Sequence, residues 1–161
     1  MTIGKDIHVK IGEVKIGREG DILRATLGSC VGIVFSWKEK KIFGLAHCLL
    51  PESPQSSSTI GAKFVSQAVP SLIALLKIKP ENAREIEVYI VGGGNMMFQL
   101  SKSNVSHIGL QNIAAARKYL HLNGFKVREL ELGGDDGRQV YVDCTSGKVS
   151  VVTFSKGRIG V

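Results

Sequence analysis

Three cysteines in 161 residues are few, and their spacing excludes two common roles. Cys30, Cys48 and Cys144 form no C-x-x-C pair of the kind that structural zinc sites use. The N-terminal stretch "MTIGKDIHVKIGEV" has neither the basic segment nor the apolar core of a signal peptide. Without a secretion signal, three cysteines argue against a disulfide framework. We therefore expect a cytoplasmic protein.

Long apolar runs and patches of one charge are also missing. No apolar run approaches the roughly 20 residues needed to span a bilayer, so we expect no membrane insertion. The net charge of +7 comes from scattered Lys and Arg residues that are not interleaved with aromatic residues. We therefore expect no nucleic-acid partner, whereas an acidic protein partner suits the charge.

The patterning that is present predicts an α/β domain. The length fits a single domain over residues 1–161, and a hydrophobic content of 43% is enough for a core. Alternation and β-branched residues predict strands at 7–17, 31–37, 41–50, 85–93, 126–132, 139–143 and 148–154. Helical spacing predicts helices at 59–77 and 106–124. Strand runs interrupted by helices indicate a mixed sheet or sheets.

Three local features refine this prediction. Pro70 should kink or split the first helix, because its ring removes a hydrogen bond and clashes with the preceding turn. Asn123-Gly124 should end the second helix. The stretch "PESPQSSST" at 51–59 reads as a surface loop, and it follows His47 closely enough to lie over a site that His47 helps to form.

The stretches "ATLGSCVGIV" and "GLAHCLLP" raise the possibility of nucleophilic catalysis. A thiol attacks carbonyl carbons as the thiolate, and a neighbouring histidine can accept its proton. Gly28 and Ser29 allow a tight turn before Cys30, which could aim free N–H groups at a substrate oxygen. If 31–37 and 41–47 pair as a hairpin, Cys30 and His47 return to the same edge of the sheet.

A structural reading stands beside the catalytic one. Free cysteine is among the most buried residue types, and a histidine at a strand end is often a satisfied structural group. Cys48 should point to the opposite face of the strand from His47. We interpret Cys48 and Cys144 as core thiols.

The motifs "LGSCVGIV", "GLAHCLLP", "VGGGNMMF", "IGLQN" and "GGDDGRQVYVDCTSGKVSV" together resemble the CheD family of chemoreceptor glutamine deamidases. The resemblance runs in order from about residue 7 to residue 154 and implies a single-domain α/β sandwich. Its sheets would be mixed and largely antiparallel, with two main helices, as in the catalytic domains of deamidating bacterial toxins. It also implies that Cys30 is the nucleophile and His47 the base.

The family resemblance further implies a substrate and partners. Such proteins hydrolyse selected glutamine side chains in methyl-accepting chemotaxis receptors to glutamate, and some also hydrolyse receptor methyl esters. Many bind a CheC-type phosphatase. The implied mechanism passes through a Cys30 thioester and requires no metal or organic cofactor. Gly28 and Ser29 would contribute to the oxyanion and substrate site, and Asn95 or Gln99 would touch substrate.

One position departs from the family pattern. The family has a threonine six positions before the cysteine, where this chain has Arg24. Thr26, four positions before Cys30, could take part of the role of that threonine from a shifted position. Alternatively, the permanent cation of Arg24 could stabilise a thiolate. A weakened activity, with receptor or phosphatase binding as the main role, is the third reading.

Overall fold

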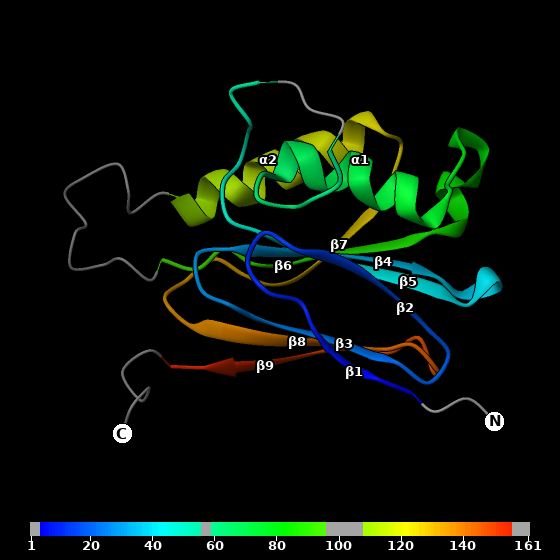
Figure 1. Cartoon of the computed structure of the whole chain (residues 1–161). Coiled ribbons are helices and arrows are strands. Elements are labelled where there is room, and N and C mark those ends of the chain that lie inside the picture. The colour runs from blue at the N-terminus through cyan, green and yellow to red at the C-terminus, as the bar shows by residue number, and fades with distance from the viewer. Residues whose placement is uncertain (1–3, 56–58, 96–107, 156–161) are drawn as a thin grey trace.

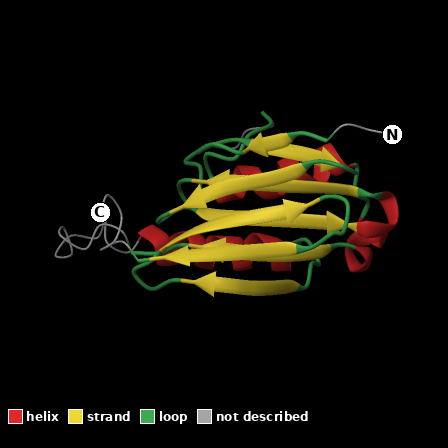
Figure 2. Ribbon diagram, turned by 90° about the horizontal axis from the view of Figure 1, so that it is seen from below, coloured by secondary structure: helices red, strands yellow, loops and turns green. Residues whose placement is uncertain are grey.

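The computed structural model of the chain describes residues 4–55, 59–95 and 108–155. These residues form three layers: two helices cover one face of a five-stranded sheet, and a four-stranded sheet covers its other face (Figure 1). Seen from below, the strands lie side by side with the helices behind them (Figure 2). The α/β sandwich with two main helices is confirmed.

The strands are β1 (Asp6–His8), β2 (Val14–Arg18), β3 (Ile22–Leu27), β4 (Val31–Trp37), β5 (Ile42–Cys48), β6 (Glu87–Gly92), β7 (Val127–Leu132), β8 (Gly137–Asp143) and β9 (Val149–Phe154). The helices are α1 (Val65–Leu76) and α2 (Ile108–Leu122), with short 3-10 turns η1 (Lys38–Lys40) and η2 (Pro80–Glu85). The sheet orders are β2-β5-β4-β6-β7 and β1-β3-β8-β9. Neighbouring strands are antiparallel except in the parallel pairs β1–β3 and β6–β7, which confirms mixed, largely antiparallel sheets.

The hairpin of β4 and β5 forms the centre of the molecule, as the sequence predicts. Every residue of both strands is buried, because one face packs on the helices and the other on the second sheet. This double burial explains the nearly continuous apolar sequence of the two strands. Lys41 closes the turn in the left-handed conformation, with φ of 55°.

Two strand predictions are wrong. The expected strand 7–17 is two strands in different sheets, separated by a turn in which Gly12 takes a φ of 85°. The strand β3 is missing from the prediction. Its pattern alternates buried Leu23, Ala25 and Leu27 with more exposed neighbours, but Ala25 has low strand propensity and masks the signal.

The first helix differs from its prediction at its start and at Pro70. It begins at Val65 rather than at 59, and it continues through Pro70 as a single helix. Pro70 lies on the exposed side, while Val69 and Leu72 are buried against the sheet. Packing of this apolar face holds the helix together despite the lost backbone hydrogen bond.

The proline- and serine-rich loop does not lie over His47 in its described part. Residues 51–55 pack against the helical layer: the Ser53 N–H donates to Ser66 Oγ, and Lys118 pairs with Glu52. Residues 56–58 lie outside the described part of the chain. No helix in the described ranges has the length and apolar character needed to cross a membrane.

Candidate functional site

The turn Gly28-Ser29-Cys30 carries the chain from one sheet to the other. Strand β3 ends at Leu27 in the four-stranded sheet, and β4 begins at Val31 in the five-stranded sheet. Cys30 is 5% exposed and belongs to the apolar cluster between the sheets, together with Leu27 and Val91. The thiol therefore lies at the point where the two sheets are joined.

His47 faces the same layer as Cys30. In the hairpin, Gly32 is opposite His47 and Val31 is opposite Cys48. Cys30 directly precedes Val31, and His47 directly precedes Cys48, so this register brings both residues to the same end of the hairpin. The predicted return of the two residues to one edge is thus confirmed.

The hydrogen bond of His47 fixes which ring nitrogen can act as a base. Its Nδ1 lies 2.9 Å from the carbonyl oxygen of Val9. Because a carbonyl only accepts, Nδ1 carries the proton in the neutral ring and Nε2 has the lone pair. Nε2 is buried and has no hydrogen-bond partner. Burial lowers the pKa of His47, and the Val9 carbonyl opposes this shift, so the ring is neutral at pH 7.

The thiol of Cys30 is protonated at neutral pH. Burial raises the pKa of Cys30 to about 11, and the residue's own backbone N–H opposes this shift. The structure contains no hydrogen bond between this thiol and His47 Nε2. A resting thiolate–imidazolium pair is therefore absent, and His47 can act only by removing the proton as the sulfur attacks.

Backbone donors are available at the turn. Within the described part of the chain, the N–H groups of Ser29 and Cys30 donate to no other residue. The carbonyl groups of the same turn are engaged: Gly94 N donates to Gly28 O at 2.9 Å, and Gly93 N donates to Cys30 O at 2.8 Å. The turn is thus held by its acceptors, which leaves the Ser29 N–H for a ligand oxygen, together with the Cys30 N–H once it separates from the residue's own sulfur.

The glycines after β6 allow close approach to this turn. A Cβ on Gly92 would lie 2.7 Å from Cys30 O, and one on Gly93 would lie 2.6 Å from the Ile113 side chain. One on Gly109, in α2, would collide with the carbonyl oxygens of Gly93 and Gly94. The prediction that the glycine-rich strand exit packs backbone close to the site is confirmed.

A hollow of about 210 Å³ lies at the glycines that donate to the carbonyl groups of the turn. Gly93, Gly94 and Asn95 line it, together with Gly109 and Asp135. The backbone N–H of Asn95 donates to Gly134 O at 2.6 Å. The predicted substrate residue Asn95 therefore lies beside the Cys30 turn, whereas Gln99 lies outside the described residues, as do Met96, Met97 and Phe98.

Asn112 connects the two halves of the site. It is fully buried, and its Nδ2 donates to Ser29 O at 3.1 Å and to Leu49 O at 3.0 Å. Helix α2 thereby holds the segment before Cys30 and the segment after His47 together. The sequence motif "IGLQN" includes Asn112 without indicating this role. The signal in the sequence that could have revealed this role is that Asn112, a polar residue, lies on the same face of the helix as the apolar Ala116 and Leu120.

Thr26 and Arg24 are not brought together with Cys30. Both lie in β3 on the face that points away from the second sheet, because Leu23, Ala25 and Leu27 occupy the inner face. Thr26 Oγ1 accepts a hydrogen bond from Gln139 Nε2 at 3.3 Å. Arg24 Nε is 2.9 Å from Asp6 Oδ1. The outer face of this sheet therefore separates both residues from the thiol and imidazole.

The remaining thiols are buried. Cys48 packs in the cluster under the helices, on the opposite face of β5 from His47, as predicted. Cys144 lies in the cluster between the sheets, and burial raises its pKa to about 12. Among the described residues, no group of three or more His, Cys, Asp or Glu side chains is placed to hold a metal ion.

An α/β sandwich with a thiol and a neutral imidazole on adjacent strand ends is the arrangement of a candidate cysteine–histidine hydrolase. The family model of CheD chemotactic sensory transduction matches residues 49–153, a region that begins just after Cys30 and His47. The chain belongs to the CheD family, as its sequence motifs predict.

Relatives match the chain over nearly its whole length. A protein of Clostridium kluyveri is 37% identical, covering 95% of this chain and 96% of its own, and is named "Probable chemoreceptor glutamine deamidase CheD". A protein of Ruegeria sp. (strain TM1040) with the corresponding name, numbered CheD 2, is 35% identical over 91% of this chain and 90% of its own. A third, from Methanococcus vannielii, is 34% identical over 90% of this chain and 93% of its own.

Proposed function

We propose that this protein deamidates glutamine side chains of chemoreceptors through a Cys30 thioester. The observation that carries the proposal is that the hairpin brings Cys30 and His47 to one end of the sheet, where His47 Nε2 is buried and has no hydrogen-bond partner. The names of the relatives supply the substrate class. On the same grounds we propose that the protein acts in the cytoplasm, on the cytoplasmic part of the receptor.

The first half of the reaction forms the thioester. The Cys30 sulfur bonds to the amide carbon as its proton passes to His47 Nε2. The N–H groups of Ser29 and Cys30 donate to the amide oxygen, which gains the negative charge. The tetrahedral intermediate then collapses: the carbon–nitrogen bond breaks, and the leaving nitrogen takes the proton from His47 and departs as ammonia.

The second half restores the enzyme. Water attacks the thioester carbon while neutral His47 Nε2 accepts a proton from it. The carbon–sulfur bond breaks, Cys30 recovers a proton and glutamate is released. The same thioester forms from a receptor methyl ester if methanol leaves in place of ammonia. The thiol in the first half, and the attacking water in the second, must come into hydrogen-bond range of Nε2, and such catalytic contacts commonly tighten on substrate binding.

The proposal gives no chemical step to Thr26 or to Arg24. Both side chains lie on the outer face of the four-stranded sheet and are engaged there with Gln139 and Asp6. Asn95 is given a contact to substrate, because it lines the hollow next to the turn.

Binding without turnover is the second candidate function. Cys30 is 5% exposed and His47 3% exposed, so a receptor glutamine reaches them only if the site opens. A protein whose site stays closed would act by engaging receptors or a CheC-type phosphatase. Receptor binding that survives Cys30→Ala is expected under both functions, so only product formation separates them.

The test is mass spectrometry of receptor glutamine peptides after incubation with the protein. Wild type should convert selected glutamines to glutamate, with a gain of about 1 Da, and Cys30→Ala should convert none. Cys48→Ala is the matched control, because Cys48 neighbours His47 but faces the helices. Equal conversion by wild type and Cys30→Ala would reject the thioester, and no conversion by either would leave the binding function.

A further inference from the structure

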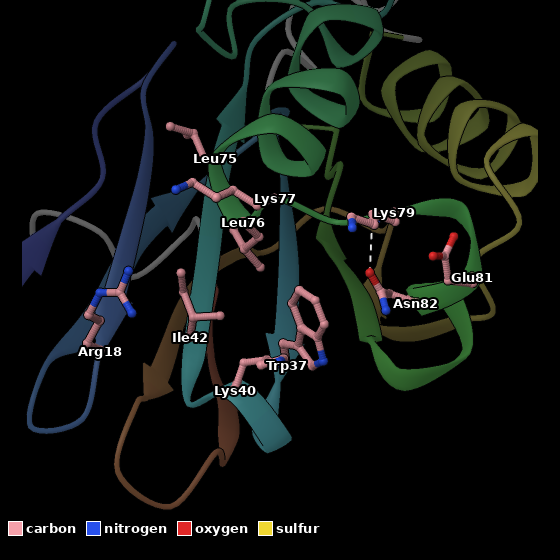
Figure 3. A pocket seen from close by; sticks show the side chains of 10 residues that line it. All are labelled: Arg18, Trp37, Lys40, Ile42, Leu75, Leu76, Lys77, Lys79, Glu81 and Asn82. Carbon is pink, nitrogen blue, oxygen red and sulfur yellow. Dashed lines mark hydrogen bonds between the residues drawn. The ribbon is translucent and has the colours of Figure 1, made fainter.

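A cationic hollow lies at the opposite end of the central hairpin from Cys30. Strand β4 begins next to Cys30 and ends at Trp37, so its seven residues separate the two places by about 23 Å at 3.3 Å per residue. The hollow has a volume of about 520 Å³. Ile42, Leu76 and Trp37 lie in its middle (Figure 3).

Four cations from three segments surround this apolar centre (Figure 3). Arg18 ends β2, Lys40 lies in η1, and Lys77 and Lys79 follow α1. Glu81 is the only carboxylate in the lining, so the lining carries four positive charges against one negative charge.

These cations have no carboxylate partner within the described part of the chain. Five basic residues elsewhere in the described part of the chain do pair with carboxylates; for example, Lys38 lies 3.2 Å from Glu87, and Arg117 lies 2.6 Å from Glu129. None of the ion pairs among the described residues involves a cation of the hollow. Uncompensated charge of one sign over a concave surface attracts ligands of the opposite sign.

The carboxyl end of α1 accounts for only part of this charge. Helix carbonyl groups favour cations at the carboxyl end of a helix, which suits Lys77, the C-cap of α1, whereas Lys79 lies beyond it at the start of η2. Arg18 ends β2, away from any helix end, whereas Lys40 lies in the last turn of the short helix η1 with its Nζ 5.9 Å from the centroid of the Trp37 ring. Neither cation pairs with a carboxylate of the described residues, so both can contact an acidic partner.

An apolar surface continues from this hollow. A second hollow of about 450 Å³ shares Lys79 and is lined by Ile78, Leu122 and Phe125 among others. Leu122 is 67% exposed. A bare anion such as phosphate would leave this apolar surface uncovered, whereas an acidic amphipathic helix would cover both the cations and the apolar side chains.

We propose that Arg18, Lys40, Lys77 and Lys79 form a docking site for an acidic amphipathic helix of the chemoreceptor. The inference rests on the proposed function for the identity of the partner. The docked segment holds the receptor while a glutamine elsewhere on it enters at Cys30. A separation of about 23 Å corresponds to about 15 residues of helix at 1.5 Å per residue, so the acidic segment lies at least that far along the receptor from the glutamine.

The test measures binding of a purified chemoreceptor cytoplasmic domain to the full chain by fluorescence anisotropy. All proteins carry Cys30→Ala, so that turnover does not alter the probe. The test variant is Arg18→Glu with Lys40→Glu, whose side chains cap no backbone group. The control is Lys5→Glu with Lys148→Glu, which changes the net charge equally. Both control residues are exposed and lie beside β1 and β9 of the other sheet.

At low salt, the Kd should rise by about tenfold or more in the test variant and by about twofold or less in the control. The two variants change the net charge equally, but only the test variant loses the contacts of the docking site. Equal weakening in the two variants overturns the docking site, and so does absence of binding by the Cys30→Ala protein without further changes. If that protein binds but wild type makes no glutamate, the proposed function fails while the contrast between the variants still decides the docking site.

Discussion

The side-chain amide of Asn112 should be worth more to the fold than an apolar group of the same size. Asn112→Leu removes both donors and leaves the carbonyls of Ser29 and Leu49 without a partner. Each lost hydrogen bond costs about 1 kcal/mol, and somewhat more when the acceptor stays buried. The substitution also removes Oδ1, which is buried without a partner and is itself unfavourable. The net loss should therefore be about 1–3 kcal/mol.

Asn112→Asp should be worse than Asn112→Leu. It keeps the size of the side chain but replaces the donating nitrogen with an oxygen that faces two carbonyl oxygens. Burying that carboxylate without a cation should cost about 3–5 kcal/mol in total. Asn123→Ala is the control, because Asn123 is exposed at the end of the same helix and makes one hydrogen bond to Tyr119 O.

Urea unfolding followed by circular dichroism measures these differences. With a slope of about 2 kcal/mol per molar urea, the midpoint should fall by about 1 M for Asn112→Leu and about 2 M for Asn112→Asp. Asn123→Ala should shift it by less than about 0.5 M. If Asp is tolerated as well as Leu, the amide does not act as a donor between the two segments, and the reasoning from the hydrogen bonds is wrong.

Four further predictions concern the site and the segments around it. Because burial lowers the pKa of His47, deamidation should persist as pH falls from 7.5 to 6.5 and should decline only below the ordinary histidine pKa of 6.5; a decline centred above pH 7 would contradict this. The free energy of unfolding should also fall on acidification below pH 6.5, because the histidine of the unfolded chain takes up a proton that the folded one resists. The rate at which iodoacetamide alkylates Cys30 should rise with pH up to about pH 11, because only the thiolate reacts. Mass spectrometry measures this rate, with Cys48 as the reference; a rate that does not change above pH 7 would show a resting thiolate. Thr26→Ala should retain turnover within about twofold, because the Thr26 side chain lies on the outer face of the four-stranded sheet; a large loss of turnover would refute that placement. Gly109→Ala should destabilise the protein by about 1–3 kcal/mol in thermal unfolding, because the added Cβ collides with the carbonyl groups of Gly93 and Gly94; an unchanged melting temperature would refute this close packing.

The central hairpin was predictable because its pairing is local. A short turn between two apolar runs allows one antiparallel pairing, and that pairing alone brings Cys30 and His47 to one edge. The second helix was predictable for a similar reason, since Ile113, Ala116 and Leu120 recur at helical spacing and are buried. The family resemblance adds the chemistry to these positions.

The errors occurred where distant segments decide the outcome. Residues 7–17 alternate like one strand, but their two halves pair with β3 and β5 in different sheets. Thr26 is only four positions before Cys30 in the sequence, but the chain crosses from one sheet to the other at Gly28–Cys30, and Thr26 faces outward. Neither crossing has a signature in the local pattern of residues.

The sequence by itself determined both helices, most of the strands and the hairpin that brings Cys30 and His47 to one edge, because each depends on residues that are close along the chain. Only the tertiary structure decided that the Val9 carbonyl holds the His47 ring, that Asn112 joins both halves of the site, and that cations from separate segments meet beside Trp37. The physical reason is that those contacts join segments far apart in the sequence, whose meeting depends on how the layers pack.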